Sequence, residues 1–128
     1  MSEQRQLLGP ALDRLLSYGG DWTMVLDDGS RIVYEVGSCD PVFGARSVTS
    51  SLGRRIASFV HPNDVALAFD KMAESLSALN SEVRFEIRAG FKGGPWRTVD
   101  VLAVNCFGDP NLNGVILRVS SLNALPER

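Results

Sequence analysis

Only a few side chains in this sequence have the types and spacing that could support catalysis or metal binding. His61 is the only histidine, and a neutral imidazole can bind haem iron or carry a proton near neutral pH. Cys39 and Cys106 are the only cysteines, and they form neither a CxxC pair nor a disulfide framework. We therefore expect two buried, reduced thiols, no metal and no haem, with His61 ordering a loop and the start of a helix.

Two further patterns have simpler explanations than a binding site. Three glycines surround Lys92 within residues 90–94, but their spacing is not that of a phosphate-binding loop, so we interpret the segment as a hairpin turn. Acidic and basic residues alternate just before it, at Glu82, Arg84, Glu86 and Arg88. A polar docking surface would give this pattern, but so would cross-strand ion pairs on a solvated face, which we favour.

Composition limits the classes of function. The chain has 128 residues, 45% of them hydrophobic, which is enough for one domain with one core. Thirteen basic and fifteen acidic residues give a net charge of −2 without basic runs, so we expect no nucleic-acid or membrane partner. The polar N-terminus leads to no long apolar run, and we expect a cytoplasmic protein.

Periodicity places five strands along the chain. Two β-rich runs, 22–26 and 31–36, flank an Asp-Gly turn and predict a hairpin. Residues 81–89 alternate between apolar and charged side chains, which is typical of a strand with one wet face. Residues 96–106 and 115–122 carry apolar side chains at both parities, so we expect both of their faces to be covered.

Two amphipathic helices are expected. Residues 10–18 form a short helix that ends at Gly19-Gly20. Pro62, with Asn63 and Asp64, favours the start of a longer helix over residues 63–79. Its predicted core-facing stripe is Val65, Phe69, Met72, Leu76 and Leu79. Residues 37–60 are expected to form loops with one or two short helices.

Four short segments together resemble the PAS sensory-domain family. They are the hairpin Val25-Leu26-Asp27-Asp28-Gly29-Ser30-Arg31-Ile32-Val33-Tyr34, then Val60-His61-Pro62-Asn63-Asp64, Glu82-Val83-Arg84 and Trp96-Arg97. The resemblance implies an α+β fold, a five-stranded antiparallel sheet of order 2-1-5-4-3 with helices on one face enclosing a pocket. The expected organisation is an N-terminal amphipathic helix or extension (1–20), a PAS-like domain (21–122) and a tail or start of a linker (123–128).

The sequence departs from the family in two places. Many members end the fifth strand with Asp-Ile-Thr, whereas this chain has Val119-Ser120-Ser121, which puts coupling through that triad in doubt. The flavin-photosensing branch carries its reactive cysteine in the helical region, but the only Asn-Cys here, Asn105-Cys106, lies in the fourth strand. We expect no cofactor, neither flavin nor haem through His61.

The resemblance and the apolar patterns nominate two sets of site residues. The candidates for lining a pocket are Trp22, Met24, Leu26, Tyr34, Phe59, Phe69, Phe85 and Trp96. The candidates for a dimer interface are Leu8, Leu12, Leu15 and Leu16. A helix this short is not stable alone, so it must pack on a second subunit or fold back on its own sheet.

The function implied is that of a sensory or regulatory module of a bacterial-type signalling protein. Such a module would bind a small apolar ligand, form a homodimer, or do both. It would act through an attached output such as a histidine kinase, a cyclic-dinucleotide enzyme or a transcriptional regulator, without being an enzyme itself. One alternative is a pure protein-interaction domain with a filled core. Another is a small α+β enzyme using Asp40, Asp100 or Tyr34 as acid or base in a pocket with convergent polar groups.

Overall fold

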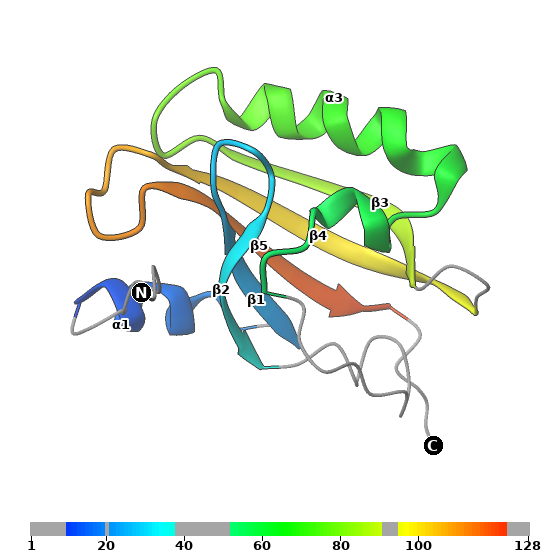
Figure 1. The fold of residues 1–128 in the computed structure, drawn as a ribbon, viewed down its shortest axis with the longest axis horizontal. Helices are drawn as coiled ribbons and strands as arrows, with labels where there is room; N and C mark the ends of the chain where they lie inside the picture. The colour runs from blue at the N-terminus through cyan, green and yellow to red at the C-terminus, as the bar shows by residue number, and fades with distance from the viewer. Residues whose placement is uncertain (1–9, 20, 38–51, 91–94, 123–128) are drawn as a thin grey trace.

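Five strands form one antiparallel sheet in the computed structural model, which describes residues 10–19, 21–37, 52–90 and 95–122 (Figure 1). The strands are β1 (Trp22–Leu26), β2 (Ile32–Gly37), β3 (Glu82–Gly90), β4 (Trp96–Cys106) and β5 (Gly114–Ser121). Their order across the sheet is β2-β1-β5-β4-β3. The predicted α+β fold and strand order are therefore confirmed, with the charged strand β3 at one edge and the two-sided strands β4 and β5 inside.

The hairpin between β1 and β2 forms around Asp27. Its carboxylate accepts hydrogen bonds from the backbone N–H groups of Gly29 and Arg31, at 2.8 and 3.0 Å. This side chain to backbone turn reverses the chain as the Asp-Gly signal predicted. The register then slips between Val25 and Leu26, so that Val25 lies opposite Tyr34 while Leu26 lies opposite Ile32. The irregularity decides which β2 side chains face which side of the sheet.

The long helix is shorter than predicted and turned about its axis. A 3-10 turn, η2 (Pro62–Asp64), precedes α3 (Val65–Ser75), in place of one helix over 63–79. The side of α3 that packs on the sheet carries Val65, Ala68 and Met72. Phe69 is 48% exposed, and Leu76 and Leu79 are exposed as well, so the predicted core-facing stripe was wrong for these three residues.

The reason for this rotation is the size of the residues that face the sheet. Ala68 lies on the packed face, and the buried Ser75 continues that face one turn after Met72, with its hydroxyl donating to the Met72 carbonyl oxygen at 2.6 Å. Small residues let the helix approach the sheet closely. The sequence prediction counted only large apolar side chains, and so it assigned the neighbouring side of the helix to the core.

Residues 53–61 cross one face of the sheet from edge to edge, and we call this segment the strap. At the β2 edge, Ile32 exchanges backbone hydrogen bonds with Gly53 and Arg54 at 2.7 and 3.0 Å. At the β3 edge, Val60 forms a bridge with Ala89, and the His61 N–H donates to the Arg88 carbonyl oxygen at 2.9 Å. Between these ends, the 3-10 helix η1 (Ile56–Phe59) lies over the sheet.

The two faces of the sheet carry separate apolar clusters. The inner face, under the strap and α3, buries the larger cluster, which includes Trp22, Phe59 and Phe85. The outer face buries a smaller cluster that includes Val25, Tyr34 and Ile116. The short helix α1 (Pro10–Ser17) lies on the outer side, away from α3 (Figure 1). Tyr18, which follows it, packs against the outer cluster.

Candidate functional site

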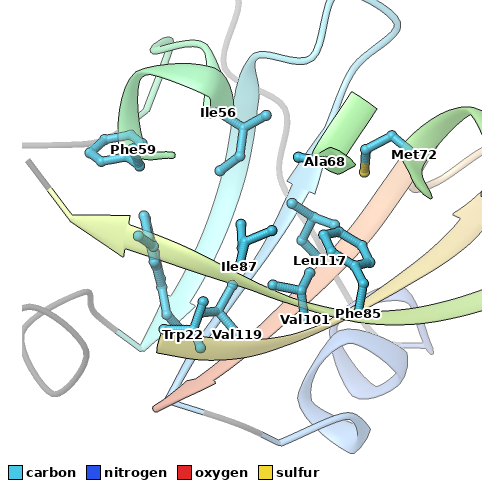
Figure 2. A pocket seen from close by; sticks show the side chains of 12 residues that line it. Trp22, Ile56, Phe59, Ala68, Met72, Phe85, Ile87, Val101, Leu117 and Val119 are labelled. Carbon is cyan, nitrogen blue, oxygen red and sulfur yellow. The ribbon is translucent and has the colours of Figure 1, made fainter. Parts of the chain in front are cut away.

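An apolar cavity of about 40 Å³ lies between the inner face of the sheet and the segments that cover it. The strap and α3 form one wall, and β1, β3, β4 and β5 form the other (Figure 2). The lining residues are all apolar: Trp22, Ile56, Phe59, Ala68, Met72, Phe85, Ile87, Ala89, Val99, Val101, Leu117 and Val119. The cavity can therefore hold a nonpolar molecule but offers almost nothing to a charged or polar one.

Trp22 is the largest fully buried side chain at the cavity. Its ring meets Phe59 edge to face, with 5.5 Å between ring centroids and 89° between planes. Its indole N–H donates to a Glu35 carboxylate oxygen at 2.7 Å. Trp22 thus joins the cavity to strand β2, and its only polar atom is already engaged in a charge-assisted hydrogen bond.

Three of the predicted pocket residues, Trp22, Phe59 and Phe85, line the cavity. Met24 and Leu26 are fully buried in the same inner cluster without lining it. Trp22, Met24 and Leu26 therefore all face the inner side of the sheet.

The other three predicted pocket residues lie elsewhere, and their assignment to the pocket was wrong. Tyr34 belongs to the outer cluster, because the slip in the hairpin register pairs it with the outward-facing Val25. Phe69 lies on the exposed flank of α3. Trp96, at the start of β4, packs against the His61 ring with 4.9 Å between centroids and lines a surface depression beside Val65.

Nine lining residues were not predicted. Ile87 and Ala89 share the parity of Phe85 on β3, so the alternation there was a usable signal. On β4 and β5, apolar side chains occur at both parities, so the sequence did not indicate which residues face the cavity. Ile56 comes from the strap and Ala68 from α3, whose orientations depend on tertiary contacts.

The segment His61 to Asp64 fastens the start of α3 to the edge of the sheet. The His61 Nδ1 atom accepts a hydrogen bond from the Asn63 N–H at 3.0 Å, which is the ordering role expected for this residue. The Asp64 carboxylate accepts three hydrogen bonds from Arg88: from the backbone N–H at 2.8 Å, from Nε at 3.0 Å and from Nη2 at 2.9 Å. These bonds lower the pKa of Asp64 to about 2.

Charged side chains pair across the outer face, and one of them, Arg84, belongs to the alternating set of β3. The Asp100 carboxylate lies 2.7 Å from Arg118 Nη2 and 3.4 Å from Arg84 Nη1. Arg118 and Asp100 are mostly buried, each with 17% of its side chain exposed, whereas Arg84 is 62% exposed. The alternating charges of β3 thus include a cross-strand ion pair, in agreement with the solvated-face interpretation.

Metal and thiol chemistry finds little support in the described part of the chain. Cys106 is buried in the outer cluster, and burial raises the pKa of its thiol. No group of three or more histidine, cysteine, aspartate or glutamate side chains could hold a metal ion among the described residues. Cys39, Asp40 and most of the 90–94 turn lie outside those residues.

Comparison with solved structures identifies the fold. The structure superposes on the PAS domain of a protein from Colwellia psychrerythraea with a TM-score of 0.69 at 16% identity, over 89% of this chain and 96% of that one. It superposes on the PAS-B domain of Drosophila melanogaster Cycle, solved with bound ethylene glycol, with a TM-score of 0.63 at 13% identity, over 79% and 99%. A variant of that domain with bound glycerol gives the same values.

The chain therefore has the PAS fold. No family model matches the sequence, and no curated protein matches it either. Within the described residues, none of the helices has the length and apolar character needed to cross a bilayer.

Proposed function

We propose that this chain is a sensory or regulatory PAS-like module of a bacterial-type signal-transduction protein, which binds a small apolar ligand and forms a homodimer. Its signal would pass to an attached output domain such as a histidine kinase, a cyclic-dinucleotide enzyme or a transcriptional regulator. The observation that carries the proposal is the apolar cavity beneath the strap and α3, in a chain with the PAS fold. A ligand held there contacts both walls at once and can change their separation.

The size of the cavity also supports a second candidate function. Pockets for ordinary organic ligands measure about 300 to 1,000 Å³, and this cavity is about 40 Å³. A protein-interaction domain with a nearly filled core would have such a cavity. A thermal-shift screen separates the two functions, because a ligand of the native state raises the melting temperature by mass action. A screen without a hit would favour the interaction domain.

The described residues do not favour an enzyme. Two of the proposed acid–base residues, Asp100 and Tyr34, lie on the outer face and so point away from the cavity. The cavity itself has no convergent polar side chains. We therefore propose a non-catalytic role for this domain, without a bound metal, flavin or haem.

The N-terminal helix supports a dimer through its exposed surface, although polar contacts also attach this helix to its own domain. Arg14 pairs with Asp109 at 3.4 Å and donates to the Asn80 side chain at 3.1 Å, so α1 is fastened to its own domain. Leu16 nevertheless remains 50% exposed. We propose that Leu16, together with Leu8, Leu12 and Leu15, buries this apolar surface against a second subunit. The side chains of Leu8, Leu12 and Leu15 lie outside the described structure.

Replacing Leu16 by Glu tests the dimer. Light scattering should report that the variant is a monomer. Because Leu16 is exposed in a single chain, the variant monomer should melt at the same temperature as the native monomer. Ser17→Glu, at an exposed neighbouring position, is the matched control and should remain a dimer. A native chain that is already monomeric at high concentration would rule the interface out.

A further inference from the structure

We infer that the inner cavity is a site for a nonpolar molecule the size of dioxygen or a very short hydrocarbon. This inference rests on the proposed sensing function and specifies its ligand class. It follows from three properties of the cavity, which are its volume, the chemistry of its lining and the nature of its walls.

The volume sets the size of the guest. A single water-sized sphere requires about 10 to 15 Å³, and the cavity measures about 40 Å³. It therefore accommodates only a guest of very few atoms. A haem, a flavin, a sugar or an amino acid is many times larger than this space.

The lining sets the polarity of the guest. Trp22 carries the only nitrogen or oxygen among the twelve lining side chains, and its N–H donates to Glu35. The Met72 thioether is only a weak acceptor. A buried water needs about two to four polar partners, so water gains little by entering. A nonpolar guest restores the dispersion contacts that the empty space lacks and gives up no strong hydrogen bonds to solvent.

The walls allow a guest to enter and be detected. The sheet side is a hydrogen-bonded ladder of four strands, whereas the opposite side consists of the 3-10 helix η1 and one face of α3 (Figure 2). Met72, on the side of α3, has three rotatable side-chain bonds and adapts readily to a change in shape. Trp22, on the sheet side, places an indole ring at the cavity, where it would contact the guest directly.

Methyl NMR of the full chain under xenon pressure tests the inference, because xenon is a nonpolar atom of suitable size. We expect saturable shifts at the lining methyl groups of Ile87, Val99, Val101 and Leu117, and none at Val25 or Ile116 on the outer face. Glycerol, a polar molecule of a few heavy atoms, should shift neither set. Saturable xenon shifts confined to the lining methyl groups would support the inference.

Matched variants on α3 assign the shifts to the cavity. Ala68→Ile fills the cavity and should abolish xenon binding, whereas Ala66→Ile, at an exposed position on the same helix, should preserve it. If Ala68→Ile does not fold, Met72→Ala provides the opposite test. The enlarged cavity should then bind benzene, which the native chain should exclude.

Two outcomes would overturn the inference while leaving different parts of the proposed function intact. If xenon produces no saturable shift but a larger or polar compound from the thermal-shift screen shifts the same methyl groups, the ligand class is wrong and the sensing function stands. If no compound of any class shifts the lining methyl groups, both the inference and ligand sensing through this cavity fail.

Discussion

The two faces of the sheet are covered in different ways. The inner face is covered by a strap and a helix whose ends are held by backbone hydrogen bonds and by the Asp64–Arg88 pair, and this cover leaves a cavity. On the outer face, the small cluster includes Leu112 and Ile116, both fully buried, and charged pairs stand beside it. The inner face is thus the one whose cover leaves space, and it is the face to which we assign the proposed ligand.

The same strands build both faces, since neighbouring residues point to opposite sides. Val101 faces the cavity while Leu102 belongs to the outer cluster, and Leu117 and Ile116 divide in the same way. Substitutions can therefore probe one face at a time.

The largest expected effect is on the inner cover. Replacing Phe59 by Ala removes a 2%-exposed ring that packs on Trp22, and should lower the free energy of unfolding by about 3 to 5 kcal/mol. The matched control, Phe69→Ala, removes the same ring from the exposed flank of α3 and should cost less than about 1 kcal/mol. Urea denaturation measures both free energies of unfolding. Equal losses in the two variants would mean that Phe69 is buried, and therefore that α3 presents a different side to the sheet.

An intermediate effect is expected on the outer face. Arg118→Ala removes the shorter bond to the mostly buried Asp100 and should cost about 1.5 to 3 kcal/mol. Arg84→Ala removes a longer contact to the same carboxylate from an exposed position, and should change the unfolding free energy by about 0.5 kcal/mol or less. If the two losses are similar, Arg118 does not fix this part of the sheet.

The smallest effect depends on pH. The pKa of Asp64 is lowered from 3.8 in the unfolded chain to about 2 in the folded protein. The charged carboxylate therefore stabilises the folded state at any pH above 3.8, and this contribution is lost as the pH falls toward 2. After allowance for the solvent around Arg88, the loss between about pH 5 and 2 should be about 1 kcal/mol. Unfolding at a series of pH values measures it.

The Asp64→Asn variant should lose that part of the pH dependence. Asp70→Asn, at an exposed position on α3, is the control and should retain it. A native-like pH dependence in the Asp64→Asn variant would assign the effect to other carboxyl groups.

Local patterns predicted the sheet well because each strand carries its own signal. The alternation of residues 81–89, the Asp-Gly turn and the two-sided strands depend only on neighbouring residues, and the resemblance to PAS domains supplied the strand order. The aromatic residues of β1 and β3 that line the cavity, Trp22 and Phe85, followed from the same parity.

The missed features depend on contacts between distant parts of the chain. The side of α3 that faces the sheet is decided by how closely Ala68 can approach it, and the position of Tyr34 by a one-residue slip in pairing. The strap is held by bonds to β2, about twenty residues before its start, and to β3, nearly thirty residues after its end. No short window of sequence contains both partners of such contacts.

The double attachment of the strap has a consequence for self-association. An uncovered sheet edge is a template for strand addition and aggregation. Here the strap already occupies backbone groups of Ile32 on β2 and of Arg88 on β3. By the alternation of an antiparallel ladder, the outward backbone groups of β3 that precede Arg88 belong to Glu82, Arg84 and Glu86. A strand added along this edge would meet the strap at one end and a row of exposed charges along the rest, so the strap and these charges together discourage growth of the sheet into a fibril.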